Sequence, residues 1–190
     1  MTDDRTTDAT ALAAHFLADA RETFAKYKKT AEGALAQMSD EMLFTVPADD
    51  PESNSAAVVV RHLAGNMRSR WTDFLTADGE KPNRDRDREF EAYEPAQATR
   101  AAVLADWEQG WRVLFGALDG LRPEDLGRTV RIRGEPLTVT QAITRQLAHY
   151  AYHVGQIVYV AKLLRAGEWK TLSIARGASR QFNEGRGRRP

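Results

Sequence analysis

The sequence predicts an all-α fold, and more narrowly a four-helix bundle. Apolar residues recur every three and four positions in four long segments, which is the period of half-buried helices. No strand-rich region competes with these segments. The chain has 190 residues, of which 42% are hydrophobic and 28% charged, a composition that suits one domain spanning residues 1–190. The four segments are residues 9–38, 55–77, 99–118 and 138–166.

Local signals mark several ends of the predicted helices. Ser55 is a plausible N-cap for the second helix. The third helix is expected to stop before Gly120, with Pro123 beyond it. Thr138 and Gln141 form a capping-box pattern at the start of the fourth helix. Gly167 is a natural stop after that helix.

The connections between the helices predict how the bundle is threaded. Residues 78–98 separate the second and third helices by 21 positions, whereas 2–8 residues are usual in bundles. A helix of about 22 residues is ~33 Å long, and an extended connection of this length reaches ~70 Å. The connection can therefore cross over the bundle, which predicts an up-down-down-up topology. Residues 128–133 alternate, and residues 134–136 could form the turn of a short hairpin.

Composition excludes some classes of function. The chain has no cysteine, so a metal site must use imidazole, carboxylate or carbonyl ligands. Acidic and basic residues are balanced at 27 each, which argues against nucleic-acid binding. No apolar stretch reaches the ~18–20 residues that a membrane span requires. The N-terminus does not resemble a secretory signal, so we expect a cytoplasmic protein without a membrane partner.

Two charged segments offer an alternative function as an interaction protein. Residues 84–89 alternate between arginine and acidic residues, which we interpret as a solvated crossover strap. The last ~15 residues have little periodicity and are expected to be flexible. Residues 176–190 carry five arginines and one glutamate, a basic tail that could contact nucleic acid.

The histidines are the main candidates for a functional site. His149 and His153 lie one turn apart within the apolar stripe of the fourth helix, a spacing that can chelate a metal. Hydrogen-bonded core histidines are the alternative. His62 shares its side of the second helix with small and polar residues, so periodicity alone favours a surface or boundary position slightly over a ligand. His15 falls off the apolar face of the first helix and is expected on the surface.

Two familiar metalloenzyme patterns are absent. A di-iron bundle site uses Glu-x-x-His, but Val59, Gln146 and Tyr150 stand three residues before the three candidate histidines. The zinc-protease motif His-Glu-x-x-His is also missing, because tyrosine and alanine follow His149.

Several motifs resemble the DinB-like superfamily, and more narrowly one of its subgroups of unknown function. The second helix contains RHLAGNM at residues 61–67, and the fourth contains HYAYHVGQI at residues 149–157. The narrower resemblance rests on RWTDFL at residues 70–75, DGEKP at 78–82 and LSI, GAS and FN between residues 172 and 183. Together these motifs cover most of the chain.

The resemblance implies a four-helix bundle in which three histidines hold one divalent metal ion. The three positions are filled here by His62, His149 and His153. It also implies frequent homodimers. Characterised members include transferases and isomerases that use low-molecular-weight thiols such as bacillithiol, mycothiol or glutathione.

These residues lead to a hypothesis about mechanism. Three imidazoles leave open metal positions, and the set suits zinc or nickel, with iron or manganese as further candidates. The metal would activate water or a cosubstrate thiol against a small electrophile, as a thiol S-transferase or a hydrolase does. Asn66, Gln146 and Gln156 would support the metal or contact the substrate. No carboxylate lies on the histidine face of the fourth helix, so the metal would generate the nucleophile. A non-catalytic metal-binding or stress-related protein is the alternative.

Overall fold

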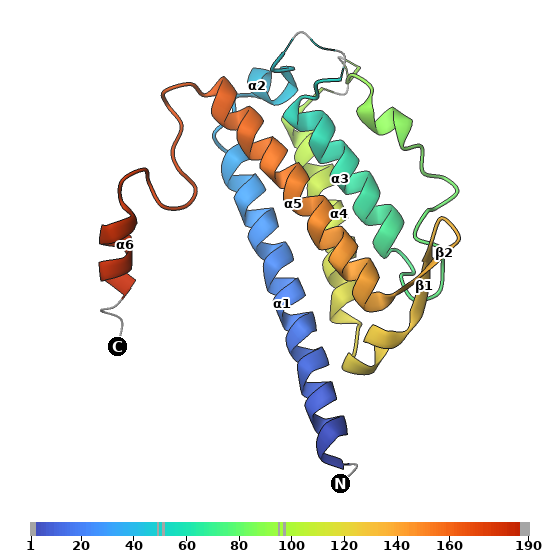
Figure 1. Ribbon diagram of the computed structural model, residues 1–190. Coiled ribbons are helices and arrows are strands. Elements are labelled where there is room, and N and C mark those ends of the chain that lie inside the picture. Colours follow the sequence, from blue (N-terminus) through green and yellow to red (C-terminus); the bar gives the residue numbers. More distant parts are fainter. Residues whose placement is uncertain (1–2, 49, 51, 95, 97, 187–190) are drawn as a thin grey trace.

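The computed structural model describes residues 3–48, 50, 52–94, 96 and 98–186, and it is mainly helical. The mainly helical prediction is confirmed. Figure 1 shows the four long helices packed side by side, with a small hairpin beside one end of them. The long helices are α1 (Asp3–Leu35), α3 (Ala56–Trp71), α4 (Arg100–Asp119) and α5 (Val139–Leu164). The short helices are α2 (Asp40–Phe44) and α6 (Ser179–Arg186), with 3-10 turns η1 (Asp87–Phe90) and η2 (Pro123–Gly127).

The long helices enclose an aromatic core. Helix α3 packs along α4 and against α5, and α1 packs along α5. The Phe24 ring lies 5.9 Å from that of Trp71 and 5.7 Å from that of Tyr150. Trp107 and Trp111 are fully buried and belong to this core. Their burial removes a large apolar area from water and holds the helices at fixed positions.

The start signals at Ser55 and Thr138 are confirmed, whereas α1 runs over Asp3–Leu35 rather than residues 9–38. The Ser55 hydroxyl accepts from the Val58 amide at the start of α3. At the start of α5, the Thr138 hydroxyl accepts from the Gln141 amide, and the Gln141 side chain accepts from the Thr138 amide, so the predicted capping box is confirmed. Helix α3 ends at Trp71 rather than at residue 77, because Asp73 takes a left-handed conformation with φ 48°.

The predicted hairpin is present and is tied to the crossover between α3 and α4. Strands β1 (Thr129–Ile132) and β2 (Glu135–Thr138) pair antiparallel around Arg133 and Gly134. The Asp78 carboxylate accepts from the amides of Arg133 (2.8 Å) and Gly134 (2.7 Å). The Gly79 amide donates to the Arg131 carbonyl at 2.7 Å. The hairpin therefore holds the first half of the crossover against the helices.

The solvated strap that the alternating charges of residues 84–89 indicated is present only in part, because residues 85–88 are exposed but the two residues at its ends are not. The side chains of Arg84 and Glu89 are only 5% and 8% exposed, and η1 places Glu89 over α3. The Arg61 guanidinium donates to the Glu89 carbonyl at 2.9 Å. Gly65 makes room for the side chain of Glu89, because a Cβ at position 65 would collide with the Glu89 carboxylate. The glycine thus allows the crossover to close on α3.

The C-terminal segment leaves the helices. In Figure 1, α6 stands apart from the long helices. Before it, the Lys170 amide donates to Gln37, whose side chain donates back to the Lys170 carbonyl. The expected flexible tail overlaps α6, which sequence patterns did not predict, and its residues 187–190 lie outside the described part of the chain. Within the described residues, no helix has the length and apolar character needed to cross a membrane.

A pair of glycines on α4 provides a test of the packing. Gly110 faces α3 so closely that an added Cβ would lie 3.0 Å from the Ala64 Cα, whereas nothing lies within 4 Å of the same position at Gly116. Alanine favours a helix over glycine by ~1 kcal/mol. We expect G116A to raise the free energy of unfolding. The free energy of unfolding of G110A should be about 1–3 kcal/mol lower than that of G116A, because the added methyl group overpacks the contact. Urea unfolding followed by circular dichroism measures both. Equal gains in the two variants would contradict the close contact between α3 and α4.

Candidate metal centre

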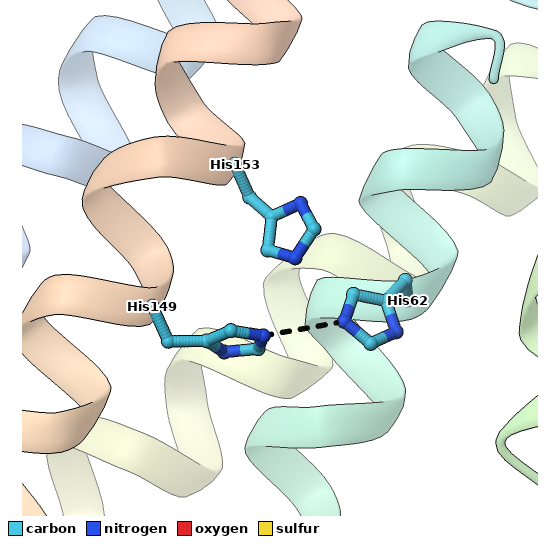
Figure 2. A group of neighbouring side chains, drawn as sticks. All are labelled: His62, His149 and His153. Carbon is cyan, nitrogen blue, oxygen red and sulfur yellow. Dashed lines mark hydrogen bonds between the residues drawn. The ribbon is translucent and has the colours of Figure 1, made fainter. Parts of the chain in front are cut away.

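The structure brings His62, His149 and His153 together. Figure 2 shows the imidazole of His62, on α3, facing those of His149 and His153, one turn apart on α5. One ring nitrogen from each lies within 4.8 Å of the others. The Nε2 atoms of His62 and His149 are 3.4 Å apart, and the His153 ring centroid lies 4.7 Å from both other rings. His15 is exposed on α1, as expected.

His62 is buried, so the boundary position that its helical face allowed is wrong. Its residue exposure is 3%. The small residues around it leave space that the crossover fills, with the Phe90 ring 4.5 Å from the imidazole and Glu89 on its other nitrogen. The polar side of α3 is therefore covered by another part of the chain rather than by water.

Glu89 fixes which nitrogen of His62 can bind a ligand. Its carboxylate lies 2.8 Å from His62 Nδ1. Burial alone would raise the pKa of Glu89, but the hydrogen bonds from Arg84 and His62 hold that pKa below its ordinary value. Because an ionised carboxylate only accepts, Nδ1 of His62 carries the proton and donates it. Nε2 then presents its lone pair to the other two histidines, an arrangement typical of metal-binding histidines.

His153 is oriented in a similar way by Gln156. The Gln156 side-chain oxygen accepts from His153 Nδ1 at 2.7 Å, which leaves Nε2 as the free acceptor. That Nε2 is buried and has no hydrogen-bond partner among the described residues. His149 differs, because its Nδ1 is the buried nitrogen without such a partner. Buried polar atoms without partners cost free energy, and a ligand between the rings would remove part of that cost.

The two α5 histidines are held neutral. Burial, followed by the neighbouring histidines, lowers the pKa of His149 from 6.5 to about 3. Burial also lowers the pKa of His153 to about 4. Metal ions bind the neutral imidazole. Three convergent imidazoles, two of them with a fixed tautomer, form a group that could hold a divalent metal ion.

A cavity of about 180 Å³ opens beside the triad. Asn66 and Gln146, two of the predicted supporting residues, line it, whereas Gln156 acts through His153. Asn66 accepts from the Tyr150 hydroxyl, which itself accepts from Trp71, so the core positions the Asn66 amide. The side-chain oxygen of Gln146 is buried without a hydrogen-bond partner within the described part of the chain.

Sequence reasoning missed Glu89 and the arginines around the cavity. It looked for a carboxylate on the α5 face, but the carboxylate at this site comes from the crossover and is bound to His62 and Arg84. One signal was present: Phe90 is a large apolar residue in a strongly charged linker, and such a residue indicates a segment that folds onto the domain.

Comparison with known protein families identifies the family of this chain. The family described as "Protein of unknown function (DUF1572)" matches residues 11–178, which include the triad and the crossover. The chain belongs to the DUF1572 family. No curated protein matches it. The DUF1572 description assigns no activity, so a function for this chain must be argued from the site itself.

Stability should depend on pH through the two shifted histidines. Between pH 6.5 and about 4, His149 and His153 bind protons in the unfolded chain but not in the folded protein. Their contribution is therefore fully present above pH 6.5 and is lost as the pH falls. We expect the free energy of unfolding of the metal-free protein to decrease over this window, as measured by urea unfolding at a series of pH values.

Two variants test the origin of this pH dependence, one at the shifted histidines and one as a control. The double variant H149Q/H153Q should flatten the pH dependence between pH 6.5 and 5, where carboxylates contribute little. H15Q, on the exposed side of α1, should retain the dependence. An unchanged slope in H149Q/H153Q would show that other groups cause it.

Proposed function

We propose that this DUF1572 protein is a metal-dependent enzyme in which His62, His149 and His153 bind one divalent ion. The observation that carries the proposal is the convergence of three buried imidazoles from two helices, with ring nitrogens within 4.8 Å of one another. Zinc or nickel suits this all-nitrogen set best, with iron or manganese as further candidates.

The residues around the triad have distinct supporting roles. Glu89 holds His62 in the tautomer that presents Nε2, and Arg84 keeps that carboxylate ionised through two hydrogen bonds of 2.8 Å. Gln156 does the same for His153 with a neutral amide. Because burial lowers the pKa of His149 and His153, these two imidazoles are uncharged at neutral pH and no proton has to be displaced from them.

His62, His149 and His153 would hold the divalent ion, and the chemistry that such an ion would supply is a lowered pKa of water or of a thiol, so that either could be a nucleophile at neutral pH. The chain has no cysteine, so a thiol would come from a low-molecular-weight cosubstrate. Gln146 and Asn66 present amides to the cavity, where they can position a small electrophilic substrate. The proposed reaction is thiol S-transfer or hydrolysis.

The wider assignment follows the resemblance to DinB-like proteins. We propose a single domain built on an up-down-down-up four-helix bundle, acting in the cytoplasm as a homodimer. The contacts of α3 with α4 and of α1 with α5 support this arrangement. In Figure 1, α3 and α4 both run away from the end that carries α2, and α1 and α5 run toward it.

Metal content tests the proposal directly. Protein purified without an affinity tag should contain about one zinc or nickel ion per chain by elemental analysis. Each of H62A, H149A and H153A removes one ligand and should lower the bound metal and any thiol-dependent activity together. The activity is measured as loss of free thiol with a panel of electrophiles in the presence of glutathione or a related thiol.

The control is H15A, which removes an exposed histidine and should change neither quantity. Unchanged metal content in all three triad variants would overturn the metal site. Full metal content without thiol consumption or hydrolysis by the wild type would instead support the alternative, a non-catalytic metal-binding or stress-related protein.

Glu89 offers a separate test of how the triad is oriented. E89Q keeps the size of the side chain but removes the charge that fixes His62, and we expect a weakening of metal affinity by about 10–100-fold. Competition with a coloured chelator measures the affinity. E91Q, which removes an exposed carboxylate two residues further along the crossover, should leave it unchanged. A thermal unfolding scan of the metal-free variants separates this effect from loss of folding.

A further inference from the structure

We propose that the cavity beside the triad binds an anionic group of a small molecule, a carboxylate or a phosphate. The proposal deepens the proposed function by naming the substrate class, and it rests on that function only in calling the anion part of a substrate. The site itself is independent of a metal, because it consists of arginines from four parts of the chain.

Five guanidinium groups line the cavity together with the triad. Arg70 lies on α3, Arg84 and Arg86 on the crossover, Arg133 in the hairpin turn and Arg145 on α5. Within the described residues, no aspartate or glutamate lines the same cavity. Arg145 stands one turn before His149 on α5, so the cationic wall and the triad share one opening. This placement is typical of a site for a small anion.

The carboxylates behind the cavity do not balance these arginines. Glu80 accepts from Arg70 (3.0 Å) and from Arg133 (2.8 Å), and it lies 3.6 Å from Arg84. Arg84 also makes both of its short hydrogen bonds to Glu89. Three arginines thus share two carboxylates, and one of these carboxylates is also engaged by His62.

The positive charges of the other two arginines, Arg86 and Arg145, are neutralised even less by nearby carboxylates. Within the described residues, Arg86 makes one ion pair, with the exposed Asp87 at 3.5 Å, and its guanidinium lies 5.0 Å from the centre of the Phe90 ring. Among the described residues, no carboxylate lies within ion-pair distance of Arg145. Both side chains are at the outer part of the site, where they can attract an anion from solution and close over it.

Two buried guanidinium nitrogens lack hydrogen-bond partners, and this is the sharpest sign of a ligand. The Arg70 side chain is 6% exposed and the Arg84 side chain 5% exposed. Nevertheless, Arg70 Nε and Arg84 Nη1 have no hydrogen-bond partner within the described part of the chain, and the nearest ion-pair oxygen to Arg84 Nη1 is that of Glu80 at 3.6 Å, too far for a hydrogen bond. Unsatisfied buried donors of charged groups are costly. An oxyanion in the cavity could accept from them in charge-assisted hydrogen bonds.

The size of the cavity limits what enters it. A volume of about 180 Å³ is below the ~300–1,000 Å³ of a site that encloses a whole drug-sized ligand. The cavity therefore accepts one compact group, and the rest of the molecule extends toward the opening. The atoms next to the anionic group would then lie beside the three imidazoles, where the proposed reaction takes place.

The experiment is calorimetric titration of inorganic phosphate and of succinate into the protein, with the neutral diamide of succinate as a third ligand. Each titration uses chelator-treated protein and protein loaded with zinc. We expect both anions to bind the metal-free protein, the diamide not to bind, and affinity to fall as salt rises. Comparing phosphate with succinate distinguishes the two anion classes.

Matched variants locate the binding. R145Q removes an exposed charge from the cavity rim, and R86Q does the same on the crossover; each should weaken anion binding by about tenfold, the usual effect of losing one charge-assisted contact. R112Q removes an exposed arginine from α4, outside the cavity, and should have no effect. Thermal unfolding scans confirm that the variants fold.

The outcomes separate this proposal from the proposed function. Binding of phosphate only to the zinc-loaded protein, with no effect of R145Q or R86Q, would place the anion on the metal and overturn the arginine site. No binding of either anion would overturn it as well. Binding to metal-free protein that depends on Arg145 supports the anion site, even if elemental analysis finds no metal and the proposed function fails.

Discussion

The contact between Glu89 and His62 is the interaction on which the site depends. It joins two segments 27 residues apart and carries a carboxylate into a region that would otherwise exclude charge. Burial of Glu89 is tolerable only because Arg84 and His62 bind its oxygens and because Gly65 has no side chain in its way. In return, Glu89 and Phe90 cover the imidazole of His62. Without the crossover, the imidazole of His62 would lie uncovered on a polar helix face, and its Nδ1 would lose the carboxylate that fixes its tautomer.

The parts of the fold that follow from local rules could be read from the sequence. The four long helices come from apolar periodicity, and the capping box at Thr138 depends on residues three positions apart. The pairing of His149 and His153 is equally local, because residues four apart on a helix face the same way. The end of α3 could not be predicted in the same way, since nothing in the composition around Asp73 indicates its left-handed backbone conformation.

The remaining features depend on contacts that periodicity cannot reveal. Alternating charges in residues 84–89 are usually solvated, but here the hairpin holds the crossover through Asp78 and brings Arg84 and Glu89 inside. His62 shows the same difficulty: its small polar neighbours predict a boundary, and only the crossover turns that boundary into an interior. The convergence of arginines from four segments is a property of the tertiary structure alone.

Metal and anion would not bind independently at this site. A divalent ion at the triad would lie beside five guanidinium groups, which would repel it, and the buried Glu89 and the half-buried Glu80 would offset part of that repulsion. An oxyanion in the cavity would supply the missing negative charge and could accept from Arg70 and Arg84. Each ligand should then strengthen the binding of the other by the same factor, because coupling between two sites is reciprocal. The cationic wall thus favours a loaded site in which the anionic substrate is already present.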